Sequence, residues 1–127
     1  MEKVLGLGGI FFKARDPETL AQWYQTHLGL PVEDFGGVFG ANLPMLVGPR
    51  RGYQLWTAFP QDSGYFPGGL MINFRVLDLD AMLAQLRAAG VAVEDKVEES
   101  DFGRFGWLTD PEGNRVELWQ VPEPRPI

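Results

Sequence analysis

Apolar and polar residues in the first half of the chain alternate in short runs, interrupted once by a helical spacing. Residues 4–14 read as a strand, with Ile10 and Phe12 on one face and Gly9, Phe11 and Lys13 on the other. Asp16 then predicts a helix N-cap, and apolar residues recur at helical spacing until Gly29, which suits a helix end. Three further strands are expected at about residues 32–39, 44–48 and 52–59, separated by glycine-containing turns.

The second half of the chain repeats this order of patterns. Residues 70–76 predict a strand, Asp78 caps a second helix that Gly90 ends, and strand candidates follow at about 91–98. Between the two halves, residues 60–69 contain two prolines and three glycines and are the best candidate for a linker.

A β-hairpin is predicted for residues 103–120, because Asp-Pro-Glu-Gly-Asn favours a turn and strand-forming residues flank it. This register places Trp107 across from Glu117. It also places Phe105 across from Trp119. Because side chains alternate along a strand, one face carries Phe105, Trp107, Arg115, Glu117 and Trp119. A carboxylate framed by two tryptophans is unusual for a plain core face, so this face is the candidate site.

The two halves match at an offset of 62 residues, which aligns the helix caps Asp16 and Asp78. The chain is therefore expected to be one α+β domain, residues 1–127, built from two copies of a β-α-β-β-β unit. The predicted parts are module 1 at about 1–59, a linker at about 60–69, module 2 at about 70–121 and a tail at 122–127. Each helix covers only one face of its sheet, so two facing sheets should form a shared concave trough.

Strand alternation divides the residues between a helix side and a trough side. In this division Gln54 is matched with Glu117 at an offset of 63, which fixes the faces expected for residues 52–59. The helix side is apolar and comprises Ile10, Phe12, Ile72, Phe74, Val116 and Leu118. The trough side mixes aromatic with polar and charged residues: Phe11, Lys13, Gln54, Trp56, Met71, Asn73, Arg75, Trp107, Glu117 and Trp119. This division fits a core on one side and a pocket on the other.

Composition narrows the classes of function. Eleven Lys and Arg residues against 17 Asp and Glu residues give a net charge of −6, which argues against a nucleic-acid partner. The absence of cysteine excludes disulfides, thiolate metal sites and cysteine nucleophiles. The apolar run near the N-terminus is too short and too rich in glycine for a signal peptide, and no run approaches a membrane span. We therefore expect a cytoplasmic protein with no membrane partner.

The sequence resembles the vicinal oxygen chelate (VOC) superfamily, which includes the glyoxalases, the bleomycin-resistance proteins and the extradiol dioxygenases. The resemblance covers nearly the whole chain and rests on the paired units and on several motifs. These are Asp-Pro-Glu-Thr-Leu-Ala-Gln-Trp-Tyr and His-Leu-Gly-Leu of the first helix, Phe-Arg-Val before the second helix, and above all Asp-Pro-Glu-Gly-Asn-Arg-Val-Glu-Leu-Trp at 110–119. The last motif is specific for the fold and much less specific for an activity.

For the enzymes of this superfamily, the resemblance implies a divalent metal held by four strand positions. These positions fall on Gly9, Gln54, Met71 and Glu117. Gly9 has no side chain, Gln54 is a weak oxygen donor, and Met71 does not suit a hard divalent ion. Glu117 is the one strong ligand, whereas a stable site needs three or four. The sole histidine, His27, lies on the first helix, away from the trough. We therefore expect no metal cofactor.

The roles of the candidate residues stay open between alternatives. Glu117 is a structural remnant that pairs with a nearby cation, or a ligand contact, or a base whose pKa is raised between the tryptophans. Lys13 and Arg75 occupy matching places in the two units and either clamp a ligand carboxylate or phosphate or pair with acidic residues. The linker tip Tyr65-Phe66 is a lid, a dimer contact or simple packing.

Three functions follow from these alternatives. The first is a metal-independent binding protein for an aromatic or cationic small organic ligand, held in the trough as bleomycin-resistance proteins hold the drug they sequester. The second is a VOC enzyme of the lyase, isomerase or dioxygenase type that uses Glu117 as a metal ligand or as a base. The third is a module without a small ligand that acts through its dimer. The resemblance also implies a homodimer.

Overall fold

A computed structural model describes residues 1–33, 36–39 and 54–122 of the chain. In chain order the elements are β1 (Val4–Ala14), α1 (Pro17–Leu28), β2 (Val32–Glu33), β3 (Gly36–Phe39), β4 (Gln54–Pro60), β5 (Leu70–Val76), α2 (Leu79–Ala88), β6 (Ala92–Val93), β7 (Glu98–Ser100), β8 (Gly103–Thr109) and β9 (Arg115–Gln120). The segment expected as one strand at 32–39 forms β2 and β3, and the segment at 91–98 holds β6 and the start of β7. The strand expected at 44–48 lies outside the described residues.

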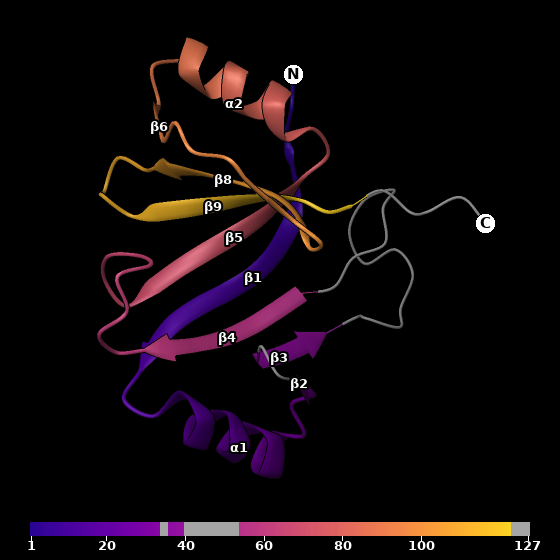
Figure 1. Cartoon of the computed structure of the whole chain (residues 1–127), viewed down its shortest axis with the longest axis vertical. Coiled ribbons are helices and arrows are strands. Elements are labelled where there is room, and N and C mark those ends of the chain that lie inside the picture. Colours follow the sequence, from indigo (N-terminus) through magenta and orange to yellow (C-terminus); the bar gives the residue numbers. More distant parts are fainter. Residues whose placement is uncertain (34–35, 40–53, 123–127) are drawn as a thin grey trace, which may run out of the picture.

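Nine strands of the described residues form one mixed sheet in the order β2-β3-β4-β1-β5-β9-β8-β6, with β7 paired to β8. At its centre β1 and β5 run antiparallel, with Phe11 opposite Met71. Since β4 is parallel to β1 and β9 is parallel to β5, the same arrangement repeats on both sides of this central pair. Figure 1 shows β1 and β5 crossing the middle of the molecule, with α1 and α2 at opposite ends. The two units therefore join edge to edge in one sheet.

Both helices begin as the sequence predicts, on an aspartate whose side chain accepts a backbone hydrogen bond. Asp16 Oδ1 accepts from the Thr19 amide at 3.1 Å, and Asp78 Oδ1 accepts from the Ala81 amide at 3.0 Å. The glycine expected after each helix adopts the left-handed conformation in both cases. No helix within residues 1–33, 36–39 and 54–122 is long and apolar enough to cross a membrane.

The two faces of the sheet carry separate clusters of buried side chains. On the helix side, α2 packs against β5 and β9 in a cluster formed by Val76, Leu79, Met82, Leu83 and Leu118. On the trough side a second cluster is formed by Phe11, Phe66, Met71 and Trp107. No residue of α1 is buried to the same degree, and its contact with the sheet includes the Tyr24 ring, 4.8 Å from that of Trp56.

The faces of β4 are the reverse of those predicted. Trp56 lies on the helix side, where its ring is 4.7 Å from that of Phe12, and Gln54 shares this face by alternation. The prediction is wrong because it changes the repeat offset from 62 to 63, and a shift of one residue moves every side chain to the opposite face. At the constant offset of 62, the counterpart of Glu117 is Leu55.

Candidate functional site

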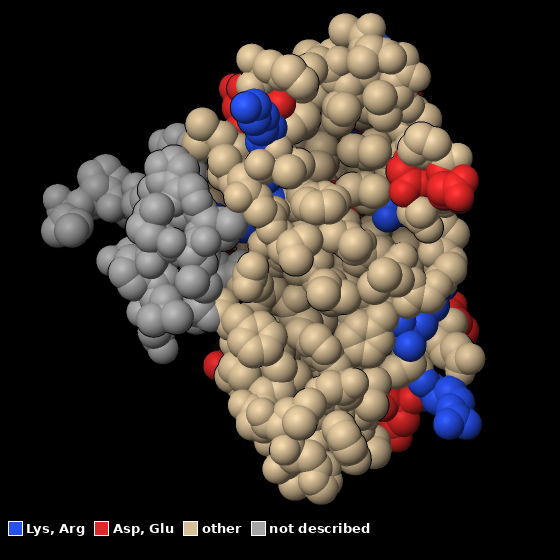
Figure 2. All heavy atoms as spheres, turned by 180° about the vertical axis from the view of Figure 1, so that it is seen from behind, with Lys and Arg blue, Asp and Glu red and all other residues tan. Residues whose placement is uncertain are grey.

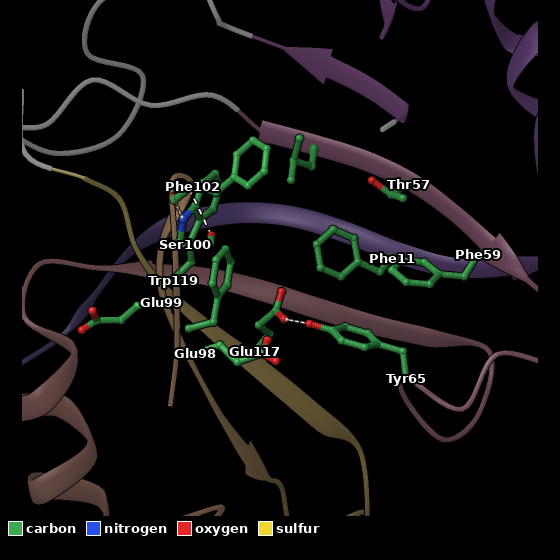
Figure 3. Close-up of a pocket in the computed structure, with 12 residues that line it drawn as sticks. Phe11, Thr57, Phe59, Tyr65, Glu98, Glu99, Ser100, Phe102, Glu117 and Trp119 are labelled. Atoms are coloured by element: carbon green, nitrogen blue, oxygen red, sulfur yellow. Dashed lines mark hydrogen bonds between the residues drawn. The ribbon is translucent and has the colours of Figure 1, made fainter. Parts of the chain in front are cut away.

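A pocket of about 490 Å³ opens on the trough side of the sheet (Figure 3). It is lined by Phe11, Leu55, Thr57, Phe59, Tyr65, Glu98, Glu99, Ser100, Phe102, Phe105, Glu117 and Trp119. Figure 3 shows Glu117 between two groups of aromatic rings, with the hydroxyl of Tyr65 pointing at its carboxylate. The pocket thus combines apolar walls with one buried charge.

Glu117, on β9, is the buried carboxylate of this pocket, with 2% of the residue exposed. Its Oε1 accepts hydrogen bonds from the Tyr65 hydroxyl at 2.5 Å and from Trp107 Nε1 at 2.9 Å. Its Oε2 accepts a hydrogen bond from Asn73 Nδ2 at 2.7 Å. Three neutral donors therefore hold the carboxylate in one orientation.

The sheet register brings two of these donors to Glu117. Trp107 lies opposite Glu117 in the β8–β9 hairpin, as the sequence predicts, and Asn73 is its partner between β5 and β9. Asn73 has room because position 8 of β1 is a glycine: a Cβ on Gly8 would lie 2.0 Å from Asn73 Oδ1. A larger residue at position 8 would therefore displace a side chain that supports the carboxylate.

Burial raises the pKa of Glu117 above its ordinary value, because the site removes water from the charged form. Hydrogen bonds from Tyr65, Asn73 and Trp107 oppose this shift, as does the positive charge of Arg115. The pKa of Tyr65 is also raised, first by burial and then by the charge of Glu117. The Tyr65 hydroxyl therefore keeps its proton and acts as a donor to the carboxylate.

Tyr65 reaches Glu117 from the loop between β4 and β5 and is held there by its neighbours. Its ring stacks on Phe59 with centroids 5.4 Å apart and planes 11° apart. Its carbonyl accepts a hydrogen bond from Arg115 Nη1 at 2.6 Å, and the Arg115 guanidinium lies 5.4 Å from the centre of its ring. Arg115 is fixed in turn by Glu94, which accepts two hydrogen bonds of 2.8 Å from it.

A second stacked pair of rings lies on the other side of Glu117. Phe105 and Trp119 stack with centroids 5.8 Å apart and planes 11° apart, as their cross-strand register predicts. Trp119 Nε1 donates to the Phe102 carbonyl at 2.7 Å, which ties the indole to the turn between β7 and β8. Glu117 therefore lies between two pairs of stacked aromatic rings.

The structure does not bring all the residues predicted for the site together. Those that line the pocket are Phe11, Phe105, Glu117 and Trp119. Asn73 and Trp107 lie beneath it and donate to Glu117. Gln54 and Trp56 are on the helix side of β4 and do not line the pocket, which corrects their predicted place.

Lys13 and Arg75 do not line the pocket either. The Lys13 ammonium lies 5.0 Å from the centre of the Phe66 ring, outside the pocket. Arg75 is fully buried, and its guanidinium lies 5.8 Å from the centre of a Trp119 ring. Because β1 and β5 are antiparallel, these matching positions lie toward opposite ends of the central pair. The two cations therefore do not converge on one ligand group in this pocket.

Several residues that line the pocket were not predicted from the sequence. They come from β4, from the loop between β4 and β5, and from β7 with the turn after it. Leu55, Thr57 and Phe59 were assigned to the wrong face by the shift in β4, and a constant repeat offset would have found them. Tyr65 was noted only as part of an aromatic loop tip, and no periodic pattern links it to Glu117. The remaining missed residues come from β7 and the turn after it: Glu98, Glu99, Ser100 and Phe102.

The side chains at the four positions implied for a metal do not form a metal site. Gly9 offers no donor, Gln54 is on the opposite face, and Leu55, which takes its place in the trough, is aliphatic. Met71 is 1% exposed and packs in the trough-side cluster. Across the described residues, no group of three or more His, Cys, Asp and Glu side chains is arranged to hold a metal ion. This donor set does not fit a catalytic divalent cation.

Three solved structures show how widely this fold is shared. Methylmalonyl-CoA epimerase in complex with methylmalonyl-CoA and NH4+ matches with a TM-score of 0.71 at 20% identity, over 96% of this chain and 100% of that chain. The epimerase from Mycobacterium tuberculosis matches with a TM-score of 0.65 at 22% identity, over 94% and 89%. Catechol 2,3-dioxygenase matches with a TM-score of 0.68 at 19% identity, over 98% of this chain and 46% of that chain.

Sequence comparison gives the family directly. No protein with a curated description matches the sequence. The profile of the glyoxalase-like domain, however, matches residues 9–119, which is most of the chain. The epimerase and dioxygenase structures share the fold that the turn motif and the paired units indicate. The chain therefore belongs to the glyoxalase-like domain family of the vicinal oxygen chelate superfamily.

Proposed function

We propose that this protein binds a small organic cation with an aromatic body in its trough, without a metal ion. The observation that carries the proposal is Glu117, a buried carboxylate in an aromatic pocket whose hydrogen-bond donors are all neutral. A ligand cation beside it would replace the charge stabilisation that the carboxylate loses when it leaves water. The ring faces around it attract cations as well.

The charges around the pocket favour a cation over an anion. No Lys or Arg of the described residues lines the pocket, whereas Glu117 does. Glu98 and Glu99 also line it, but they pair with Lys96 at 2.9 Å and with Arg104 at 2.8 Å, so the buried carboxylate of Glu117 carries the preference. The ligand of one similar epimerase structure is methylmalonyl-CoA, which is an anionic thioester. Such a ligand would meet the buried carboxylate of Glu117, so like-charge repulsion opposes its binding at this pocket.

Metal independence is part of the proposal and is supported by donor chemistry. Gly9, Leu55 and Met71 offer no oxygen or nitrogen side-chain donor, and the lone pairs of Glu117 are already shared among three protein donors. The proposal is tested by elemental analysis of the purified protein and by thermal melts with added Zn²⁺, Mn²⁺, Ni²⁺ and Fe²⁺. A stoichiometric, tightly bound metal that stabilises the protein would overturn metal independence.

Ligand charge is tested by calorimetry with three compounds of one shape: 2-naphthylmethylamine, 2-naphthylmethanol and 2-naphthoate. The ammonium compound should bind most tightly and the carboxylate least. Glu117→Gln should weaken binding of the ammonium compound about tenfold or more, the value of a hydrogen bond to a charged group. Glu112→Gln, at the exposed hairpin turn, is the matched control. Equal binding of all three compounds, or tightest binding of the carboxylate, would contradict the proposal.

Base catalysis by Glu117 is the second candidate, and a specific observation favours it. Burial raises the pKa of Glu117 above its ordinary value, which makes the carboxylate a stronger base, and the Tyr65 hydroxyl, 2.5 Å from Oε1, is a proton donor beside it. The reaction would be an isomerisation by proton abstraction next to a carbonyl group. Deuterium exchange at the α-carbon of aryl ketones, measured by NMR, tests this function. Exchange that persists in Glu117→Gln would rule out Glu117 as the base.

The homodimer implied by the resemblance stays a prediction. On the helix side of β1 and β5, Leu7, Ile10 and Leu70 are 41–49% exposed and form an apolar strip between the helices. The face of the molecule seen from behind in Figure 2 carries few charged side chains at its middle. Analytical ultracentrifugation of wild type and Ile10→Lys tests whether a second copy covers this strip. A wild-type monomer at high concentration would contradict the dimer.

A further inference from the structure

Most of the acceptor positions on the Glu117 carboxylate are already taken by hydrogen bonds from other side chains of the protein. An ionised carboxylate has about four acceptor positions on its two oxygens. Oε1 accepts from both Tyr65 and Trp107, and Oε2 accepts from Asn73. Within the described residues, one acceptor position therefore remains, and it belongs to Oε2. A ligand in the pocket meets a carboxylate that can accept one further hydrogen bond.

The donors differ in how they face the pocket. Trp107 and Asn73 are 1% and 0% exposed and approach Glu117 from the sheet, where no ligand reaches. Tyr65 approaches from the loop between β4 and β5 and lines the pocket itself, as Figure 3 shows. Its hydroxyl therefore occupies the place on Oε1 that a second ligand N–H would otherwise take.

We infer that Tyr65 determines ligand specificity by restricting Glu117 to a single ligand hydrogen bond, which selects protonated amines over amidinium and guanidinium groups. This inference deepens the proposed function and rests on it. Amidinium and guanidinium groups bind a carboxylate best through two parallel N–H groups, one to each oxygen. Tyr65 excludes that geometry, because Oε1 already carries two donors. An ammonium group needs only the remaining position on Oε2.

Tyr65→Phe separates this role from simple packing. The variant removes the hydroxyl and keeps the ring that stacks on Phe59 and lies under Arg115. Calorimetry with 2-naphthylmethylamine and 2-naphthamidine, both monocations, gives the ratio of their affinities for each protein. Loss of the hydroxyl also changes the protonation of Glu117, but this affects both cations alike and cancels in the ratio. We expect the ratio to move about tenfold towards the amidine, the value of one charge-assisted hydrogen bond.

Tyr24→Phe is the matched control. Tyr24 lies on α1 against Trp56, on the opposite side of the sheet, so loss of its hydroxyl should leave the ratio unchanged. A ratio that is unchanged in Tyr65→Phe, or that moves equally in the control, would overturn the inference while leaving the proposed function in place. If none of the cationic compounds binds wild type, the proposed function fails and the inference fails with it.

A second test needs no variant. In wild type, replacing the primary amine with its N,N-dimethyl derivative leaves one N–H and should change the affinity by less than about threefold. The N,N,N-trimethyl derivative has no N–H and should bind about tenfold more weakly than the dimethyl derivative. If dimethylation already causes the full loss, Glu117 accepts more than one ligand hydrogen bond and the inference is wrong.

Discussion

The two helices carry the same local signals but bury different amounts of their surface. α1 and α2 each start on an aspartate cap and are followed by a left-handed glycine. α2 buries Leu79, Met82 and Leu83 against the sheet, whereas no residue of α1 is buried to that degree. A repeated pattern in the sequence therefore fixes where a helix begins and ends, but not how much of the core it forms.

The trough side shows a parallel difference between the modules. The second module supplies Glu117 together with its donors Asn73 and Trp107, so it holds the buried charge. The first supplies Phe11 and the β4 wall, which are mostly apolar. The difference indicates that the two copies of the unit have diverged, one towards the core and the charged site and the other towards an apolar surface.

The largest expected effect concerns the unequal burial of the two helices. It is tested at Met82 and Leu20, which match at the repeat offset of 62. Met82→Ala should lower the free energy of unfolding by about 2–5 kcal/mol, because it opens a cavity in the helix-side core. Leu20→Ala should cost clearly less, because Leu20 is only partly buried on α1. Chemical denaturation of both variants gives the two values. Equal losses would show that α1 is packed as tightly as α2.

Gly8→Ala tests whether a residue of the first module positions the side chains around Glu117 in the second module. The new Cβ would lie 2.0 Å from Asn73 Oδ1 and 2.9 Å from Trp119 Cε3, so the floor of the trough must shift. We expect a loss of about 1–3 kcal/mol in unfolding free energy, as for overpacking, together with weaker binding of cationic ligands. Gly64→Ala, where a Cβ meets no atom within 4 Å, is the control. Unchanged ligand binding in Gly8→Ala would show that position 8 does not affect the site.

Glu117→Gln tests whether the buried carboxylate of the second module makes stability depend on pH. Burial raises the pKa of Glu117 in the folded state above its unfolded value, so the folded protein binds this proton more tightly. The free energy of unfolding should therefore fall as pH rises through the interval between the two pKa values. Thermal melts across pH should show that Glu117→Gln lacks this decrease and is relatively more stable at alkaline pH. A variant with the wild-type pH profile would show that Glu117 is not the titrating group.

Binding should respond to pH in the opposite direction. A cationic ligand needs the ionised form of Glu117, so its affinity should decrease as pH falls through the raised pKa of this group. The decrease should begin at a higher pH than an ordinary carboxyl group would give. Calorimetric titration with 2-naphthylmethylamine across pH measures it, and an affinity that falls only where an ordinary carboxyl group titrates would contradict the raised pKa.

The smallest expected effect comes from the helix caps, where the two modules should respond alike. Asp16→Ala and Asp78→Ala each remove one side-chain acceptor from a helix N-terminus, so both should lower the melting temperature slightly. Asp16→Asn and Asp78→Asn retain an acceptor and serve as controls. A large loss for Asp78→Ala beside none for Asp16→Ala would show that even the local signals are used differently.

Much of the fold could be predicted because its signals are local. The aspartate caps and the hairpin turn, with Trp107 opposite Glu117, depend on neighbouring residues and are found in the structure. The side of the sheet is predicted correctly for Phe11 and Glu117, because their strands are anchored by a nearby cap or turn. These features were enough to predict Asn73 and Trp107 beneath the pocket and the stacked pair of Phe105 and Trp119 beside Glu117.

The rest of the site depends on information that no local pattern carries. β4 follows a long stretch without a clear landmark, so a one-residue error in the offset reversed the face of Trp56. Tyr65 is 52 residues from Glu117 in the sequence, and only the path of its loop brings the two together. The acidic rim at Glu98 and Glu99 likewise depends on how β7 pairs with β8. Tertiary structure decides all three.

The antiparallel pairing of β1 and β5 bears on how a ligand enters and leaves. Seven residue pairs, from Val4 with Val76 to Phe12 with Leu70, join the modules along this seam. Opening the modules as a hinge would break these backbone hydrogen bonds together, which costs far more than moving a loop. For the proposed ligand, we therefore expect residence time in the pocket to depend on motions at the rim and not on opening of this seam.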